Sequence, residues 1–329
     1  MTVPEILAAI PGLSALVVGD VCLDRWCRYE PRFDEPSRET GIPRVAVVEV
    51  ERTPGAAGTV ASNLVALGVG RVAVLGVSGA DGHAHELRLA LEARGIDATG
   101  LITDPNGLTF TYTKLINRET GIEDLPRVDY LNSGDLAPAI EQAVVARFQL
   151  SAPLFDVILV SDQMELDSGG VVTAALREAI AVFAARYPGK VVWVDSRARP
   201  ELFRGVLVKV NEDEAAAACR RLGCPTDYQW LRWQVGSDTL VLTKGGEGAV
   251  VVTADGETLV PALPVENVVD ICGAGDSFNA GASLALFLTR DAVAAARFGN
   301  LVASITITKP GTGTASPEEV IGAATVRER

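Results

Sequence analysis

Histidine is the functional side chain that this sequence lacks most: only His83 and His85 occur among 329 residues. Both lie in one charged segment with a helical pattern, which leaves little basis for a Ser-His-Asp triad or a histidine-rich metal site. The cysteines form an odd set without CxxC spacing, so reduced thiols are favoured over a disulfide framework or a zinc site. They are Cys22, Cys27, Cys219, Cys224 and Cys272.

Long apolar runs and excess positive charge are also missing. No uninterrupted apolar run reaches the length of a transmembrane helix, and the first residues, MTVPEILAAI, lack the basic start of a secretory signal. The formal net charge of −13 argues against nucleic acid or an anionic membrane as the main partner. We therefore expect a cytoplasmic protein that acts on small molecules. Its hydrophobic content of 48% is enough for one large core.

Apolar β-branched runs alternate with helical patterns, which is typical of a parallel α/β fold. The expected strands are Ala15–Gly19, Val72–Gly76, Val157–Ser161, Val191–Asp195, Val206–Val210 and Leu240–Thr243. The expected helices are Gly58–Leu67, Ala84–Arg94, Val171–Ala185, Glu212–Leu222, Ser277–Leu288 and Ala292–Ile305.

Two segments depart from this rhythm. Arg44–Glu51 and Leu108–Ile116 alternate apolar and polar residues, as strands with one solvated face do. We interpret them as a small β lid outside the main sheet. The whole chain, 1–329, is expected to form a single domain, with lid strands inserted at about 30–54 and 107–130.

The most informative motif is DICGAGD, Asp270 to Asp276, which precedes an apolar helical pattern. Gly273 and Gly275 permit close approach to the main chain. A helix that begins near Ala274 leaves the amides of its first turn unpaired and partially positive, which makes an anion site. Donors for a transferring phosphoryl group beside a base for the attacking hydroxyl, here Asp276, are the parts of a kinase active site. A glycine-rich loop before a helix also occurs without any catalytic role.

Two segments suit an acceptor molecule. Asp24 follows the first strand, where its carboxylate can accept hydrogen bonds from two sugar hydroxyls, and a turn-capping role is the alternative. The segment TPGAAGTVASN brings Gly55 and Ala56 to the start of a helix, where a ligand can come close. Asn63, at its end, can donate and accept. Simple packing is the alternative here.

A third segment, Asn211 to Glu214, opens a helix after an apolar strand. Asn211 is a suitable N-cap, and acidic residues in a first turn complement the helix dipole. That account is sufficient by itself. In the alternative, Asn211 and Glu214 hold a hydrated Mg²⁺ near nucleotide phosphates, because Mg²⁺ keeps several waters and few protein ligands.

The remaining loops suit a nucleotide. The turn TKGGEG is either a hairpin or a flat surface for ribose and phosphates, and no GxxxxGK[ST] loop occurs. The Gly/Thr loop Lys309–Ser316 is a candidate to complete that pocket or to hold a monovalent cation such as K⁺. The candidate contacts are Thr243, Gly245, Gly246, Gly248, Asn300, Lys309 and Gly311.

Together these motifs resemble the ribokinase (PfkB) family of carbohydrate kinases, from about residue 15 to 316 and in the family's order. The resemblance implies a ribokinase-like three-layer α/β/α domain with a mostly parallel sheet and a β lid. It also implies Mg²⁺ and ATP as the donor and a sugar hydroxyl as the acceptor. The site residues implied are Asp276 as base, Gly273, Ala274 and Gly275 as anion hole, Asn211 and Glu214 for Mg²⁺, Asp24, Gly55 and Ala56 for the sugar, and Gly245, Gly246 and Gly248 for the nucleotide.

Within the family, GDVCLDRW, the RVDY segment that begins at Arg127, and KPGTGTASPEE are most similar to bacterial D-glycero-D-manno-heptose-7-phosphate kinases. That similarity implies a sugar-phosphate substrate. The family's GGAAN reads GAAGT here, with Thr59 in place of the Asn, and its SDYxKG element lacks the Tyr and Lys.

Two alternatives stay open: a nucleoside kinase, since the family includes adenosine kinases, and a sugar-binding regulator without turnover. We also expect a homodimer through the lid, because strands with one apolar face often pair across a two-fold axis.

Overall fold

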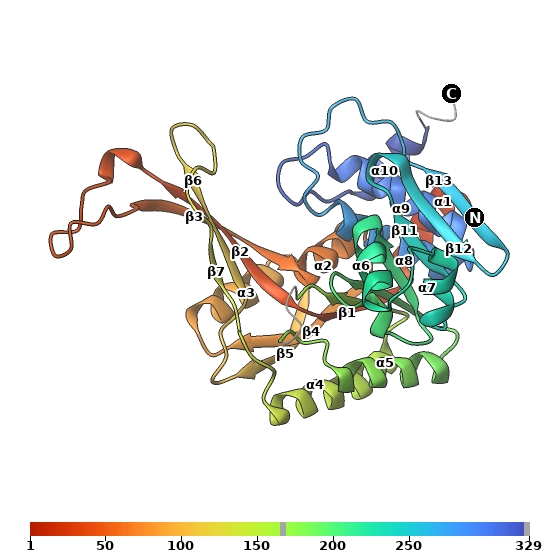
Figure 1. The fold of residues 1–329 in the computed structure, drawn as a ribbon. Coiled ribbons are helices and arrows are strands. Elements are labelled where there is room, and N and C mark those ends of the chain that lie inside the picture. The colour runs from red at the N-terminus through yellow and green to blue at the C-terminus, as the bar shows by residue number, and fades with distance from the viewer. Residues whose placement is uncertain (165–168, 326–329) are drawn as a thin grey trace.

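A nine-stranded sheet forms the centre of the computed structural model, which describes residues 1–164 and 169–325 (Figure 1). Its order is β13-β12-β11-β10-β9-β8-β1-β4-β5. All neighbours from β11 to β5 are parallel, and the β12–β13 hairpin extends the other edge antiparallel. The strands are β1 (Ser14–Gly19), β4 (Arg71–Gly79), β5 (Asp97–Asp104), β8 (Val157–Asp162), β9 (Val191–Ser196), β10 (Leu207–Asn211), β11 (Leu240–Thr243), β12 (Gly248–Thr253) and β13 (Gly256–Pro261).

Helices cover both faces of this sheet, so the strands are buried on two sides and read as continuous apolar runs. One hydrophobic core lies under α1 (Val3–Ala9), α2 (Ala57–Ala66), α3 (Gly82–Glu92), α8 (Ala274–Thr289), α9 (Ala292–Thr306) and α10 (Pro317–Thr325). The other core lies under α4 (Pro138–Ser151), α5 (Ala174–Arg186), α6 (Glu212–Arg221) and α7 (Tyr228–Gln234).

A second sheet of four strands projects from the body (Figure 1). Its order is β3-β2-β6-β7, and we call it the small sheet. It consists of β2 (Val21–Tyr29), β3 (Val47–Ala56), β6 (Thr111–Asn117) and β7 (Val128–Tyr130). Only Asp20 separates β1 of the main sheet from β2 of the small one. The small sheet therefore rises directly from the carboxyl edge of the main sheet, where the parallel strands end.

The α/β fold with a mostly parallel sheet is confirmed, and the expected strands and helices lie within a few residues of their observed bounds. The sequence interpretation missed β2, because Asp20–Asp24 was taken for a turn beyond the first strand. It also missed β5, β13, α1, α4, α7 and α10. In the part of the chain that is described, no helix is long and apolar enough to cross a membrane.

Candidate active site at the carboxyl edge of the sheet

The start of α8 has the geometry of an anion site. Gly273 adopts φ 76°, the left-handed conformation that glycine tolerates, and directs the chain into the helix. The amide of Ala274 donates to the carbonyl of Ile271 at 3.1 Å, so this donor is engaged, contrary to the expectation that it is unpaired. The amides of Gly275 and Asp276 have no acceptor among the described residues. Two adjacent donors therefore point away from the helix start.

The Asp276 carboxyl lies beside these amides, half-buried. Burial, and then the negative charge of Asp195, raise its pKa to about 7, while Lys209 and Arg197 oppose that rise. A carboxyl with a pKa near neutrality can accept a proton and release it again at working pH. The start of α8 thus combines anion donors with a potential base.

A second carboxyl, that of Asp24 on β2, faces the same region. In the small sheet Asp24 pairs with Thr53 of β3 and with Tyr112 of β6. Burial raises its pKa to about 6, although the positive charges of Lys114 and Arg127 act against this. A Cβ on Gly55 would lie 2.5 Å from Asp24 Oδ2, so a larger residue there would displace this carboxyl. The structure thus brings Asp24 and Gly55 together, as the sequence predicted.

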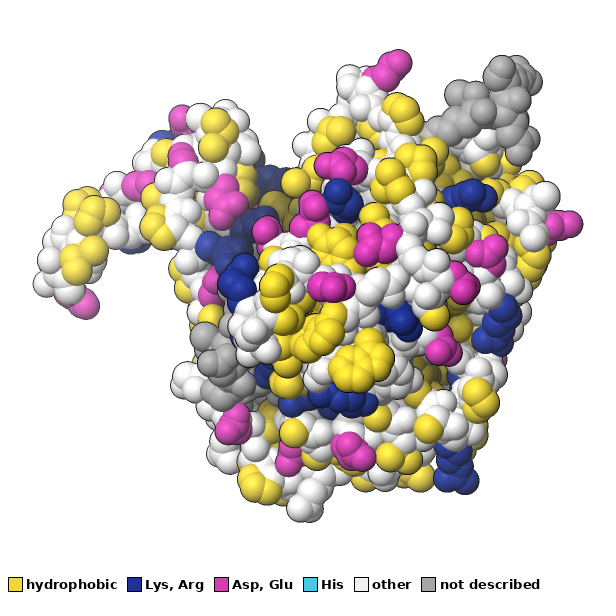
Figure 2. Space-filling model, turned by 45° about the vertical axis from the view of Figure 1, so that its right-hand side comes forward, with side chains coloured by type: hydrophobic (Ala, Val, Ile, Leu, Met, Phe, Trp, Pro, Cys, Tyr) yellow, Lys and Arg dark blue, Asp and Glu magenta, His cyan; other side chains and the backbone are white. Residues whose placement is uncertain are grey.

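Basic side chains gather in the hollow between the small sheet and the body (Figure 2). The Lys114 ammonium lies 4.2 Å from the centroid of the Trp26 ring. The Arg127 guanidinium lies 4.9 Å from the centroid of Tyr112 and donates twice to Asp129, at 2.7 Å each. These aromatic contacts hold both cations on the small sheet, near Asp24.

Arg197 is a site residue that sequence reasoning missed. It follows β9 directly, and its charge lowers the pKa of both Asp276 and Glu214. The motif VDSRAR carried the signal, because polar residues just beyond a parallel strand reach the edge where α/β proteins bind ligands.

The turn before α2 is strained. Ala56 adopts φ 52° and ψ −118°, a backbone conformation that residues with a Cβ rarely occupy. Thr59 is buried, and a Cβ built on Gly273 would lie 3.4 Å from its γ-methyl group. Asn63 is fully buried, with its amide donating to the Thr59 carbonyl at 3.0 Å and its Oδ1 unpaired among the described residues. Asn63 therefore stabilises the first turn of α2 through this hydrogen bond. Its contact with a substrate stays a prediction.

Asn211 and Glu214 form a capping box at the start of α6. The Asn211 side chain accepts from the Glu214 amide, and Glu214 Oε2 accepts from the Asn211 amide, each at 2.8 Å. The capping role is thus present. Among the described residues no group of three or more His, Cys, Asp and Glu side chains forms a metal cluster. The pair still fits a hydrated Mg²⁺, since burial raises the pKa of Glu214 and a cation would stabilise its charged form.

On the nucleotide side, Thr243 ends β11 and donates to the Val210 carbonyl at 3.4 Å. Gly245 and Gly246 have open space where a Cβ would stand, as a surface for a ligand requires. Gly248 has a structural role, because a Cβ there would lie 2.2 Å from the Val260 carbonyl oxygen. The Asn300 amide nitrogen holds β13 against α9, through the carbonyls of Val260 at 3.0 Å and Pro261 at 3.2 Å.

The C-terminal loop packs against the start of α8. The Asp270 carboxylate accepts from the amides of Cys272 at 2.9 Å and Gly311 at 3.1 Å, which joins the two loops. Lys309 donates to the Thr314 carbonyl at 2.6 Å and pairs with Glu319 at 2.7 Å, so its ammonium stabilises the loop. A Cβ on Gly311 would lie 3.9 Å from the Trp26 ring, so this loop also meets the small sheet.

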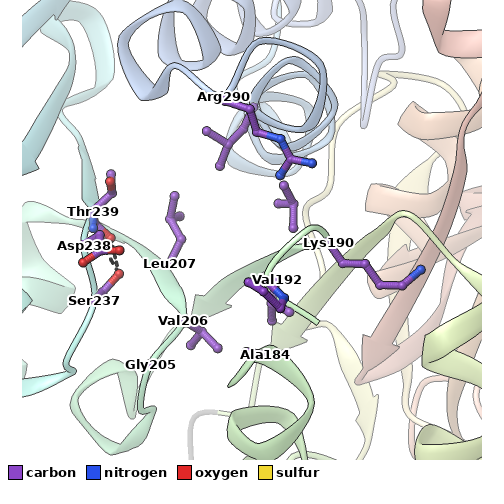
Figure 3. A pocket seen from close by; sticks show the side chains of 13 residues that line it. Ala184, Lys190, Val192, Gly205, Val206, Leu207, Ser237, Asp238, Thr239 and Arg290 are labelled. Carbon is purple, nitrogen blue, oxygen red and sulfur yellow. Dashed lines mark hydrogen bonds between the residues drawn. The ribbon is translucent and has the colours of Figure 1, made fainter. Parts of the chain in front are cut away.

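A separate cavity of about 320 Å³ lies at the opposite, amino edge of the main sheet (Figure 3). Its lining includes Val192, Leu207, Ser237, Asp238 and Arg290. In Figure 3 the Lys190 side chain points away from it. The cavity holds none of the residues described above, so it is not part of the candidate active site.

The carboxyl edge of the parallel sheet carries two amides without acceptors at a helix start, close to carboxyls with raised pKa values, and this arrangement suits phosphoryl transfer. The chain belongs to the pfkB family of carbohydrate kinases, whose model matches residues 14–319. It is therefore a kinase of the carbohydrate class.

Curated relatives match almost the whole chain. The chain is 32% identical over 316 residues to "Bifunctional protein HldE" of Geotalea uraniireducens, which covers 94% of this chain and 62% of that protein. It is also 32% identical to the protein of the same name from a Caulobacter species, over 98% of this chain and 65% of the relative. The chain thus spans less than two thirds of the length of these curated relatives.

Among solved structures, the phosphofructokinase-2 of Escherichia coli in complex with potassium superposes with a TM-score of 0.72 at 18% identity, covering 96% of this chain and 100% of the other. The ligand-free nucleoside kinase of Burkholderia thailandensis gives a TM-score of 0.70 at 19% identity, over 94% and 100% of the two chains. These likenesses confirm the ribokinase-like fold.

Proposed function

We propose that this chain transfers the γ-phosphoryl group of ATP to a hydroxyl of a sugar that already carries a phosphate, with a heptose 7-phosphate as the leading candidate. The observation that supports this most is the position of Asp276, a carboxyl with a pKa of about 7 beside two unpaired amides at the start of α8.

In the proposed reaction, the Asp276 carboxylate takes the proton of the acceptor hydroxyl as its oxygen attacks phosphorus in line, and the bond to the leaving ADP breaks. Mg²⁺, when bound with ATP, supplies neutralisation of phosphate charge. The amides of Gly275 and Asp276 hold the migrating group, an interaction worth ~3–4 kcal/mol per good donor. Asp24 positions the acceptor by accepting from its hydroxyls, in the narrow space beside Gly55.

The phosphate on the acceptor is proposed from the basic side chains of the small sheet. Lys114 and Arg127 both lie close enough to Asp24 to lower its pKa. Neutral sugar hydroxyls need no such cations, whereas a substrate phosphate is bound by fixed Lys and Arg donors. The likeness to heptose-phosphate kinases points the same way.

The remaining assignments belong to this proposal. The small sheet acts as a lid that excludes water from the reacting groups. The loops that begin at Thr243 and Lys309 bind the nucleotide, the second of them with K⁺ as a candidate ligand. Asn211 and Glu214 are the candidates for holding Mg²⁺. The five cysteines are free thiols, one of them exposed, which supports a reducing compartment such as the cytoplasm.

A homodimer through the small sheet is proposed on the exposed side chains of Val45, Val47 and Val48, which are 41–44% accessible. Sizing chromatography at micromolar concentration tests it, and a monomer profile would contradict it.

The activity itself is tested by ATP consumption with D-glycero-D-manno-heptose 7-phosphate, fructose 6-phosphate, ribose and adenosine as acceptors. We expect the phosphorylated sugars to be turned over and the other two to be poor. Faster turnover of adenosine would favour the nucleoside kinase alternative. No turnover of any acceptor would favour the non-catalytic regulator.

Variants sharpen this test. Asp276→Asn is expected to lower kcat by ~10²-fold or more and to leave ATP binding near normal, because only proton removal is lost. Lys114→Ala is expected to raise the KM of a phosphorylated acceptor by ~10-fold, which is about 1.4 kcal/mol of binding. Lys190→Ala, at the opposite edge of the sheet, is the matched control. An unchanged KM in Lys114→Ala would remove this lysine from the acceptor site.

A further inference from the structure

A lysine is buried beneath the candidate anion site, where the apolar strand β10 gives no reason to expect one. Lys209 is 5% exposed. It lies on the side of β10 that faces α8, between Val208 and Val210, which belong to the core on the other face. A Cβ built on Gly275 would lie 3.6 Å from Lys209 Nζ. The ammonium therefore lies close to Gly275, whose amide we assign to the migrating phosphoryl group.

Lys209 is one end of a buried polar network that joins three elements. Its Nζ donates to Asp195 Oδ2 on β9 at 3.0 Å. The same oxygen accepts from Asn279 Nδ2 on α8 at 2.6 Å. Asn279 Oδ1 in turn accepts from Trp193 Nε1 at 3.0 Å. Asn279 lies one turn after Asp276, so this network holds the first turn of α8 against β9 and β10.

We propose that Lys209 is a positioning residue: with Asp195 it forms a buried ion pair that fixes the start of α8, and its own charge favours the ionised form of the Asp276 carboxylate. The inference rests on the proposed function, because it assigns Asp276 the role of base. The two charges act on Asp276 with opposite signs, Asp195 raising its pKa and Lys209 lowering it.

Other charged and titratable groups surround this pair. Arg197 and Asp24 also act on the pKa of Asp276, and Glu214 acts on that of Lys209. The charge of Asp276 also contributes to the raised pKa values of the buried Cys22 and the Cys272 thiols, for which burial is the largest cause. Of the charged groups acting on Asp276, only Asp195 and Lys209 are both buried and hydrogen-bonded to each other, so their charges have fixed positions and little screening by solvent.

Because Asp195 and Lys209 shift the pKa of Asp276 in opposite directions, removing each charge should move the pH profile in opposite directions. A general loss of activity would not produce this pattern. In Lys209→Met, which keeps the length and removes the charge, the acid limb of the kcat/KM profile should move up by ~1 pH unit or more. At pH 7 kcat should fall by ~10-fold, with the acceptor KM little changed. In Asp195→Asn the acid limb should move down. Lys209→Arg, the conservative variant, should return it toward the wild-type position.

Two outcomes would overturn the proposal: an acid limb that stays in place in Lys209→Met, or one that moves the same way in both variants. If Lys209→Met does not fold, the downward shift in Asp195→Asn still decides, and its absence contradicts the proposal. The pKa of Asp276 can also be read without turnover, as the ¹³C-carboxyl titration that disappears in Asp276→Asn. Full activity of Asp276→Asn would defeat the proposed function. Loss of activity there with unshifted limbs in the other variants would defeat this inference alone.

Discussion

At the scale of single residues, the candidate site contains two carboxyls whose surroundings oppose ionisation. Burial is the first cause for both Asp276 and Asp24, whose pKa values rise to about 7 and about 6. Each also has a lysine in reach, Lys209 for Asp276 and Lys114 for Asp24, which limits the rise. Asp276 can therefore exchange protons near neutral pH, whereas Asp24 is mostly ionised there.

The first prediction follows for the pH dependence of catalysis. A base is active when ionised, and a raised pKa means that protons are held up to higher pH. The kcat/KM for the acceptor should therefore fall below a pH of about 7 and level off above it. A profile flat down to pH 5 would contradict the role of Asp276. ATP binding measured by calorimetry is the control, and it should change little between pH 6 and 8.

The second prediction concerns Ala56 and its unfavourable φ of 52°. Replacement by glycine relieves strain of ~1–3 kcal/mol, of which ~0.5–1 kcal/mol is lost again to the entropy of the unfolded chain. Ala56→Gly should raise the free energy of unfolding, measured by urea denaturation. Ala57→Gly, one residue further in the regular first turn of α2, is the control and should lower it by ~1 kcal/mol.

At the scale of elements, the sequence was sufficient for those with a strong period. Apolar runs and caps mark locally the central parallel strands (β1, β4 and β8 to β11) and the helices at Glu212 and Ala292, so these could be predicted, whereas the edge strand β5 could not. Strand β2 could not, since Asp24 and Arg25 interrupt its pattern: one face of it borders the site and the other pairs with α3. Residues that meet only in space, such as Lys209 and Gly275, leave no spacing to detect.

The same limit applies to the candidate site. The DICGAGD motif predicted where α8 begins and which carboxyl lies beside it. The sequence could not show that the Ala274 amide donates to Ile271, that Asn300 donates to strand β13, or that Lys309 donates within its own loop. Those outcomes depend on carbonyls supplied by distant parts of the chain.

The third prediction uses the close contact between β2 and β3. A Cβ on Gly55 would lie 2.5 Å from both Asp24 Oδ2 and Cys22 Sγ. Gly55→Ala should displace the Asp24 carboxylate and raise the acceptor KM by ~10-fold or more, or about 1.4 kcal/mol, with the ATP KM unchanged. Gly82→Ala is the control, because nothing lies within 4 Å of its added Cβ. Equal effects on both KM values would point to general unfolding.

At the scale of the whole molecule, an ion triad joins the small sheet to the body. Arg25 and Arg52 lie directly opposite each other on β2 and β3. Glu86 of α3 pairs with both, at 3.2 and 2.9 Å. Two like charges in register repel each other, so the carboxylate between them is what makes this register favourable.

The fourth prediction is that Glu86→Gln loosens this junction. The two guanidinium groups lose their shared counter-charge, which should cost about 1–2 kcal/mol of stability. Hydrogen exchange should speed up in β2 and β3 before it does in the main sheet. Glu92→Gln, at the exposed end of the same helix, is the control. Uniform acceleration across the chain would contradict a local role.

Only one residue, Asp20, separates β1 from β2, so a small rotation at this residue would tilt the projecting strands of the small sheet. The Asp20 carboxylate is held in place because it accepts hydrogen bonds from the amides of Gln163, Met164 and Val171 at 2.8–3.1 Å. The nine residues of β2 reach ~30 Å outward at ~3.3 Å each, so a tilt of ~5° swings the tip by ~2.5 Å. Asp24, only four residues out, would travel ~1 Å. A large displacement of the tip would therefore move Asp24, the contact that we propose for the acceptor hydroxyl, only slightly.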